Sequence, residues 1–193
     1  MFTQLISQAL DQFDCSPWGG TSGRAAPYAP VQPRPLYSLE ERQRRDASPW
    51  TVVQGVLAPA QFAVFLISLF LVLHYLRTGT GEWAATASVV TKTGFLYVIM
   101  ITGSIWEREV FGRYLFAPAF YWEDVVSMLV LALHTTYLVA LLSGQVDGTR
   151  LAWLALAAYA SYVVNAAQFV VKLRAARKQG AAWSAPAGMG LSA

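Results

Sequence analysis

Residues 51–76 read TVVQGVLAPAQFAVFLISLFLVLHYL, and this stretch contains no Asp, Glu, Lys or Arg. A helix needs about 20 predominantly apolar residues to cross the hydrocarbon core of a bilayer. Three more segments of this kind follow at residues 83–106, 123–143 and 151–173. Two of the three connections are short, so consecutive helices are antiparallel neighbours. The pattern predicts an all-α integral membrane protein, a four-transmembrane-helix antiparallel bundle.

The composition of the chain agrees with a membrane protein. Its 193 residues are 55% hydrophobic and 13% charged, whereas a soluble domain carries about 25% charged residues. The single Cys15 excludes an internal disulfide framework and a multi-cysteine metal site. The two histidines, His74 and His134, exclude a histidine-rich metal centre. A glycine-rich phosphate loop is absent from the sequence, which argues against a nucleotide-driven machine.

The two ends of the chain differ from the membrane domain, which we place at residues 35–177. Residues 1–34 are expected to form a flexible N-terminal extension, in which a short apolar segment precedes a Pro- and Gly-rich linker. The apolar residues between Phe2 and Phe13 recur at helical spacing, so they indicate either an amphipathic helix or a frayed terminus. Residues 178–193 are expected to form a flexible C-terminal tail.

Lysine and arginine near the helix ends predict the orientation in the membrane. Eleven of these residues lie in the N-terminal tail, the middle connection and the C-terminal tail, whereas only Arg77 and Arg150 lie in the other two connections. Both termini and the middle connection are therefore expected to face the cytoplasm. The same distribution explains the net charge of +3 without a nucleic-acid partner.

Each predicted helix carries one polar stripe. The cheapest arrangement in lipid turns all four stripes inward, onto a shared polar interior. The alternative is that the stripes only bind the helices together. For Lys92, the corresponding alternative is a structural ion pair with a carboxylate. The residues of the stripes are Gln54, Gln61 and Ser68; Lys92; Glu123, Ser127 and His134; and Ser161, Asn165, Gln168 and Lys172.

The middle connection, together with the helix ends that flank it, is dense in charged and aromatic residues. It is either an aromatic belt at the membrane surface or the mouth of a pocket for a flat, amphipathic ligand. In a pocket, Trp106 and Trp122 would stack on the ligand, and Arg108 and Arg113 would hold an acidic substituent. His134 follows Glu123 by eleven residues, about 16 Å along a helix, which sets the depth of such a pocket.

Six long motifs give the chain a family resemblance. It resembles the 3-vinyl (bacterio)chlorophyllide hydratases, also called 2-vinyl bacteriochlorophyllide hydratases, from about Pro35 to Arg177. The motifs are PLYSLEER at 35–42, RDASPWTVVQGVLAP at 45–59, TGSIWE at 102–107, YLFAPAFYWED at 114–124, ALHTTY at 132–137 and NAAQF at 165–169.

The resemblance implies an enzyme that adds water to the C3 vinyl group of chlorophyllide a, or of its bacteriochlorin relative, and gives the 3-(1-hydroxyethyl) derivative. It implies no redox cofactor, ATP or added metal, because the magnesium belongs to the substrate. It places the protein in a bacterial inner or intracytoplasmic membrane. The expected partners are the chlorophyllide and membrane lipids, with a homo-oligomer or other enzymes of bacteriochlorophyll biosynthesis as further candidates.

The chemistry of hydration suggests roles for the polar residues. The reaction needs a carboxylic acid that stays protonated and a base that orients water. Glu123 and Asp124 point about 100° apart on a helix, so we expect one of them to work with Glu107 rather than with each other. His134 is expected to bind the substrate magnesium or to act as the base. Lys92, Arg108 or Arg113 would pair with the propionate.

The remaining substrate contacts are assigned to Trp106, Trp122, Asn165 and Gln168. The main alternative is a non-catalytic pigment-binding protein, such as a carrier, an assembly factor or a small subunit of a photosynthetic complex. A second alternative is a small transporter with Lys92 and Asp124 along its path, but the two halves of the sequence show no inverted repeat.

Overall fold

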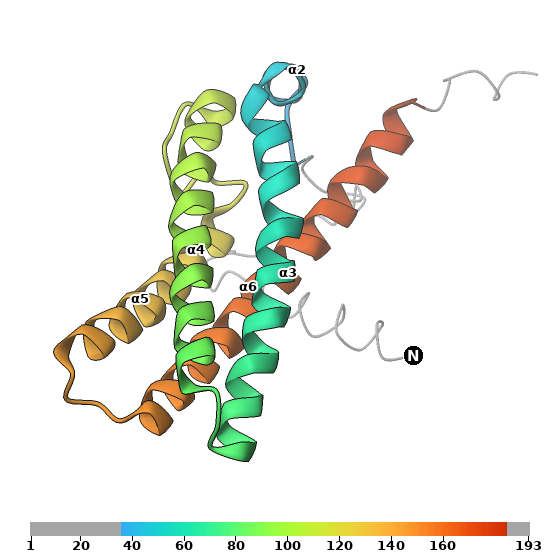
Figure 1. Cartoon of the computed structure of the whole chain (residues 1–193). Coiled ribbons are helices and arrows are strands. Elements are labelled where there is room, and N and C mark those ends of the chain that lie inside the picture. The colour runs from blue at the N-terminus through green and yellow to red at the C-terminus, as the bar shows by residue number, and fades with distance from the viewer. Residues whose placement is uncertain (1–35, 185–193) are drawn as a thin grey trace, which may run out of the picture. The chain divides into compact units, whose positions relative to one another are not determined.

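The structure is a computed structural model that describes residues 36–184, with side chains as far as Arg177. Cys15, the apolar segment near the N-terminus, the Pro- and Gly-rich linker and residues 185–193 lie outside the described residues. The described chain is helical, with no strands. Its helices are α2 (Leu39–Ala47), α3 (Pro49–Thr78), α4 (Glu82–Phe111), α5 (Tyr121–Ser143) and α6 (Gly148–Ser184) (Figure 1).

The four long helices are long and apolar enough to cross a membrane. They contain the four segments that hydropathy picks out, so the predicted all-α bundle of four membrane-spanning helices is confirmed. Helix α6 is longer than expected and continues through Ser184, so the first residues of the predicted C-terminal tail are helical.

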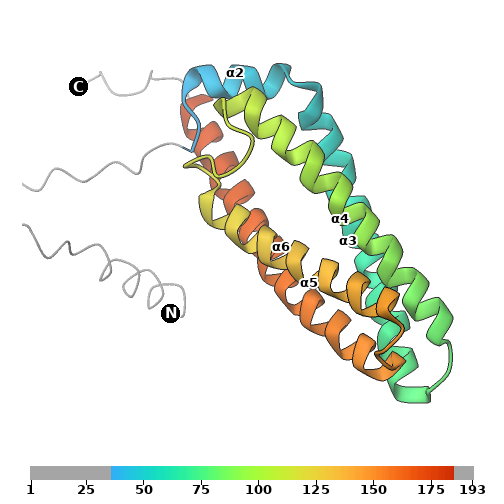
Figure 2. The same ribbon diagram turned by 90° about the vertical axis from the view of Figure 1, so that its left-hand side faces the viewer.

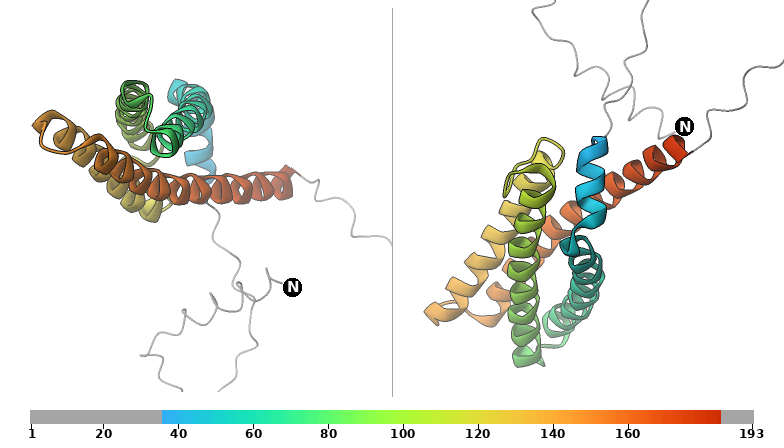
Figure 3. Two further views of the ribbon diagram at one scale, coloured as in Figure 1. Left: turned by 60° about the horizontal axis from the view of Figure 1, so that its bottom comes forward. Right: turned by 90° about the horizontal axis from the view of Figure 1, so that it is seen from above.

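The bundle consists of two helical hairpins. Helices α3 and α4 form one antiparallel pair and α5 and α6 form the other, with the closest packing inside each pair. The two pairs cross each other, and α6 passes against both α3 and α4 (Figures 1 and 3). A longer connection, residues 112–120, joins the two hairpins at the end where α4 stops and α5 begins.

The charged segment before the first span forms a helix of its own. Ser38 caps α2: its hydroxyl accepts from the Glu41 N–H at 3.2 Å, and the Glu41 carboxylate accepts from the Ser38 N–H at 2.7 Å. Pro49 then starts α3, a position where its missing N–H costs nothing. Helix α2 packs on α4 and lies across the end of the first hairpin (Figure 2).

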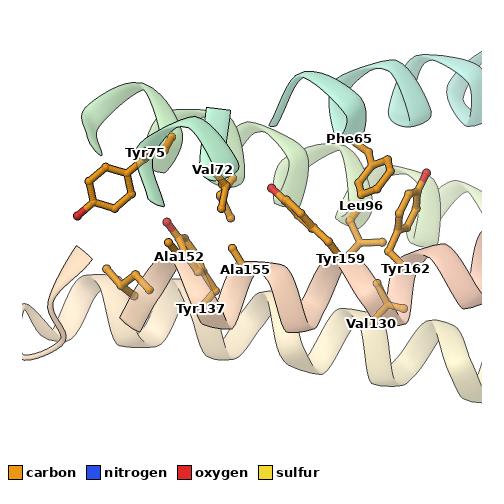
Figure 4. Close-up of a cluster of buried hydrophobic side chains, with 13 residues drawn as sticks. Phe65, Val72, Tyr75, Leu96, Val130, Tyr137, Ala152, Ala155, Tyr159 and Tyr162 are labelled. Atoms are coloured by element: carbon orange, nitrogen blue, oxygen red, sulfur yellow. The ribbon is translucent and has the colours of Figure 1, made fainter. Parts of the chain in front are cut away.

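The core combines tyrosines with small residues. Tyr159 and Tyr162 rise from α6 toward α3 and α4, and Phe65 meets the Tyr159 ring edge-on at 5.4 Å between centroids (Figure 4). Ala152 and Ala155 on the same helix are buried and let the neighbouring backbones approach closely. Large apolar side chains such as Leu142 and Phe70 point outward instead, as a lipid-facing surface requires.

Several residues of the polar stripes bind helices together. Gln54 of α3 donates to Thr102 of α4 at 2.7 Å. The amide of Asn165 donates to Ser127 at 2.9 Å and joins α6 to α5. Ser68 shares a hydrogen bond of 2.5 Å with Tyr159. For Gln54 and Ser127 the interpretation as interhelical contacts is confirmed, whereas the Ser161 hydroxyl bonds only to its own helix.

Candidate active site

Two buried carboxyl groups meet where the hairpins join. Glu107 lies near the end of α4 and Asp124 near the start of α5, and their side chains are hydrogen-bonded to each other. Only 6% of Glu107 and 4% of Asp124 is exposed. Two carboxyl groups in contact cannot both carry full charge, so such a pair shares a proton. Of the two carboxyl groups of α5 that the sequence offers as a partner for Glu107, Asp124 is the one that lies beside it.

The connection between the hairpins supplies hydrogen bonds to this carboxyl pair. The Phe116 N–H donates to Asp124 Oδ2 at 2.7 Å, and the next N–H, of Ala117, donates to Glu107 Oε2 at 3.3 Å. Phe116 adopts a left-handed backbone with φ of 59°, which costs an ordinary side chain roughly 1–3 kcal/mol. This strained turn aims two successive donors at the two carboxyl groups.

Glu123 faces a different neighbour. Its Oε2 lies 2.5 Å from the Lys172 ammonium of α6, and the same ammonium donates to the carbonyl oxygen of Ala119. Lys172 also lies over the Phe120 ring, 4.8 Å from its centroid. Glu123 is therefore held in an ion pair beside the Glu107–Asp124 pair rather than within it.

Two polar side chains lie deeper in the bundle, both fully buried. His134 Nδ1 lies 2.8 Å from the carbonyl oxygen of Val130, so it carries the hydrogen, and the neutral ring presents Nε2 as an acceptor. Lys92 Nζ lies 3.8 Å from the centroid of the Tyr162 ring. Neither Nε2 nor Nζ has a hydrogen-bond partner in the described part of the chain. The alternative of an ion pair between Lys92 and a carboxylate is therefore wrong.

Asn165 and Gln168 complete the inward face of α6. The Asn165 amide nitrogen is used by Ser127, which leaves its Oδ1 buried. Oδ1 of Asn165 and Oε1 of Gln168 have no hydrogen-bond partner among residues 36–177. Buried acceptors of this kind are rare in proteins unless water or a ligand satisfies them.

The arginines and tryptophans named from sequence are spread over the same end of the bundle. Arg108 and Arg113 are exposed, and the Arg108 guanidinium lies over the Tyr114 ring at 4.4 Å. Trp122 is 69% exposed. Trp106 is half-buried and donates from its indole N–H to Thr51 at 2.9 Å. The structure thus brings Trp106 into the bundle and leaves the other three on its surface.

Trp106 belongs to an aromatic cluster that covers this end of the bundle. Phe111 and Phe120 lie 5.8 Å and 5.6 Å from its ring, and Tyr37 stacks on Phe111 at 5.8 Å. Burial raises the pKa of Tyr37 to about 12, against the opposing influence of Arg45. Trp106 and Phe111 flank Glu107 on α4, and Phe120 directly precedes α5, so the cluster forms at the helix ends that carry the carboxyl pair.

Sequence reasoning missed two parts of this site. The sequence identifies Lys172 only as the last residue of the polar stripe on α6. Its helical spacing from Asn165 is the one signal that places it on the inward face. The backbone donors of Phe116 and Ala117 carried no signal, because a left-handed phenylalanine is not recognisable from sequence. In the described residues, no group of three or more His, Cys, Asp or Glu side chains converges as a metal site.

The fold and the site define a multi-pass membrane protein that gathers its ionisable groups inside a bundle of helices. The family whose sequence model matches residues 37–175 is 2-vinyl bacteriochlorophyllide hydratase. A protein of that name from Cereibacter sphaeroides is 62% identical over 152 residues, which cover 78% of this chain and 94% of the relative. Another from Rhodobacter capsulatus is 59% identical over 157 residues, 80% of this chain and 91% of the relative. No solved structure matches the chain.

The chain belongs to the 2-vinyl bacteriochlorophyllide hydratase family. It is therefore an enzyme, a hydratase of bacteriochlorophyll biosynthesis, and the resemblance seen in its motifs is confirmed. This membership decides against a non-catalytic pigment carrier and against a transporter.

The ion pair between Lys172 and Glu123 yields a stability prediction. Replacing Lys172→Met leaves the Glu123 carboxylate buried without its cation, and we expect a loss of roughly 3 kcal/mol of unfolding free energy. Adding Glu123→Gln to the same chain should restore part of this loss. Thermal unfolding of the purified protein in detergent measures both variants.

The control is Arg150→Met, because Arg150 forms an exposed ion pair with Asp147 at 3.1 Å. Such pairs contribute about 0–1 kcal/mol, so its midpoint should stay near that of the wild type. A Lys172→Met protein as stable as this control would contradict the assignment of a stabilising buried pair.

Proposed function

We propose that this hydratase adds water to the C3 vinyl group of chlorophyllide a, or of its bacteriochlorin relative, and forms the 3-(1-hydroxyethyl) derivative. The vinyl group numbered 2 in the name of the relatives is the C3 vinyl group of the current numbering. The observation that carries the proposal is the hydrogen-bonded pair of Glu107 and Asp124. Hydration of a vinyl group needs an acid and a base in one place, and this pair supplies both.

The reaction forms one C–H bond and one C–O bond. A proton adds to the terminal CH₂, which becomes a methyl group, and the positive charge remains on the carbon next to the macrocycle, where the ring delocalises it. Water attacks that carbon through its oxygen, and a base removes one of the water protons. These steps balance without a redox cofactor, ATP or an added metal, and the magnesium enters with the substrate.

We assign the acid to Glu107 and the base to Asp124. Asp124 accepts the shorter of the two backbone hydrogen bonds, from Phe116 at 2.7 Å. Hydrogen bonds to a carboxylate favour its charged form. Glu107 receives only the 3.3 Å contact from Ala117, so the shared proton resides on Glu107. Glu123, engaged by Lys172, is assigned an electrostatic role beside them.

Conservative replacement of the two carboxyl groups tests these assignments. Glu107→Gln and Asp124→Asn keep the shape of the pair but remove proton transfer. We expect hydration of chlorophyllide a to fall about a hundredfold to ten-thousandfold, while the pigment still binds. Chromatography with mass detection measures the hydrated product, and absorption spectroscopy measures binding.

Glu109→Gln is the matched control, because Glu109 lies on the same helix end but is exposed and accepts a hydrogen bond from Ser48. It should retain wild-type hydration. Full activity in Glu107→Gln would remove Glu107 from the chemistry. Bound but unchanged pigment with the wild-type protein would contradict the proposed reaction itself.

We assign His134 to the substrate magnesium. Its Nδ1–H is directed to the Val130 carbonyl, and a hydrogen bond of this type is what orients a histidine that binds metal through Nε2. Helical side chains lean toward the N-terminus of their helix, so the His134 ring leans toward Asp124. The two residues are ten positions apart, about 15 Å along the helix, a separation that a chlorin ring and its vinyl group can bridge with the two side chains.

Lys92 is our preferred partner for the free propionate of the pigment. It is a fully buried cationic residue whose Nζ has no hydrogen-bond partner in the described structure, and an unpaired charge in lipid is costly. Arg108 and Arg113 are exposed and already solvated. A carboxylate brought in by the substrate would compensate Lys92.

The magnesium assignment predicts a difference between pigments. The wild-type protein should bind chlorophyllide a more tightly than the magnesium-free pheophorbide, because only the former offers a ligand position to Nε2. In His134→Ala we expect this preference to disappear and the absorption band of the bound pigment to shift. Titrations followed by absorption measure both, with His74→Ala, at an exposed histidine, as the control.

A preference for chlorophyllide that survives in His134→Ala would refute the magnesium role. If hydration is then lost while the preference stays, His134 acts as the base instead.

We place the protein in the inner or intracytoplasmic membrane with both termini in the cytoplasm. The excess of Lys and Arg at the ends of the chain and in the connection between the hairpins supports this orientation. Lipids and the chlorophyllide are its immediate partners. A homo-oligomer, or contact with the enzymes that supply and consume this poorly soluble pigment, is consistent with the apolar outer surface of the helices.

The single cysteine offers a test of the orientation. Cys15 should react with a membrane-permeant maleimide in intact spheroplasts and resist an impermeant one. A Gln145→Cys residue, introduced with Cys15→Ser, should react with both, because Gln145 lies in the exposed α5–α6 connection. Labelling of Cys15 by the impermeant reagent would reverse the proposed topology.

A further inference from the structure

We infer that Asn165 and Gln168 bind the water molecule that attacks the vinyl group. This inference rests on the proposed hydration reaction and adds the site of its second substrate. Asn165 Oδ1 and Gln168 Oε1 are buried acceptors without a hydrogen-bond partner among the described residues. An acceptor in such a position needs a donor, and water is the donor that every turnover of a hydratase requires.

The orientation of the Asn165 amide follows from its neighbour. Its nitrogen donates to the Ser127 hydroxyl at 2.9 Å, and this bond places Oδ1 on the other side of the amide. Gln168 lies three residues further along α6. Side chains at this spacing are neighbours on one helix face, with Cβ atoms about 5–6 Å apart. The two oxygens can therefore accept from one and the same water molecule.

This pair of oxygens lies level with the carboxyl pair. Helices α5 and α6 are antiparallel, and two contacts set their register: Glu123 meets Lys172, and Ser127 meets Asn165. Along α5, Asp124 lies between Glu123 and Ser127. Along α6, Gln168 lies between Asn165 and Lys172. A water molecule held by Gln168 and Asn165 is thus at the depth of Asp124.

The chemistry of the amides suits a nucleophilic water. When one hydrogen is donated to the amide oxygens and the other to Asp124, the lone pairs of the water oxygen remain free to attack the carbon that bears the positive charge. An amide oxygen is too weak a base to remove the proton after the C–O bond forms. That proton passes to Asp124, so Asn165 and Gln168 position the water and the carboxylate completes the reaction.

The test compares hydration with hydrogen exchange in deuterated water. Transfer of deuterium from the acid to the terminal CH₂, followed by return of a hydrogen, leaves the vinyl group labelled without hydration. Gln168→Met and Asn165→Leu should lower hydration of chlorophyllide a roughly tenfold to hundredfold. Their recovered substrate should carry more deuterium per product formed than that of the wild type. Mass spectrometry of substrate and product gives both numbers.

Two controls accompany the variants. Ser161→Ala changes the same helix, but the Ser161 hydroxyl bonds only to the Ala158 carbonyl at 2.7 Å, so both measured values should match those of the wild type. Glu107→Gln should lose exchange and hydration together, because it removes the acid. Gln168→Met breaks no hydrogen bond of the described structure. Asn165→Leu loses the bond to Ser127 and could unfold for that reason, and in that case Gln168→Met alone still tests the water site.

The outcomes separate this inference from the proposed function. Wild-type hydration in Gln168→Met and Asn165→Leu would overturn the water site and leave the hydratase assignment intact. Equal losses of exchange and hydration would also overturn it, because such losses would place the two residues with the acid. Absence of hydration by the wild-type protein would overturn both.

Discussion

The hydrogen bond between the side chains of Glu107 and Asp124 is the contact on which the arrangement of this protein depends. It joins the last turn of α4 to the first turn of α5 and so links the two hairpins. Ionisable groups are costly near lipid unless they meet a partner. Glu123 meets the same requirement through Lys172 on α6. The two interactions gather three carboxyl groups and one ammonium at one end of the bundle, while the apolar side chains face outward.

The polar groups of the interior fall into two sets with different properties. One set is engaged between helices: the Gln54 amide donates to Thr102, and Ser68 shares a hydrogen bond with Tyr159. The other set has unused hydrogen-bonding capacity, and its atoms belong to Lys92, His134, Asn165 and Gln168. A protein that only needed a stable bundle would gain from satisfying these atoms. Their distribution along α4, α5 and α6, from the middle of the bundle to the carboxyl pair, is consistent with a large ligand that carries charge, metal and reactive carbon at separate points.

Hydropathy was sufficient to predict the four membrane spans, because their length and their lack of charge are properties of the sequence itself. The helical spacing of Ser127 and His134, and of Asn165 and Gln168, also predicted correctly that these residues face the interior. The pairing of Glu107 with Asp124 rather than Glu123 depends on the rotation of α5 about its axis, which a single sequence leaves open. Lys172 and Glu123 are 49 positions apart, and nothing local relates them. The free oxygen of Asn165 follows only from knowing that Ser127 occupies its nitrogen.

The division of the bundle into two hairpins has a consequence for biogenesis. Each hairpin packs mainly against itself, as expected when consecutive helices leave the translocation machinery in pairs. The carboxyl pair takes Glu107 from the first hairpin and Asp124 from the second, and the strained turn at Phe116 lies in the segment that is synthesised between them. A newly inserted first hairpin therefore holds only half of the carboxyl pair. The pair forms only when the second hairpin docks against the first, so a chain that stops after its first hairpin lacks the pair altogether.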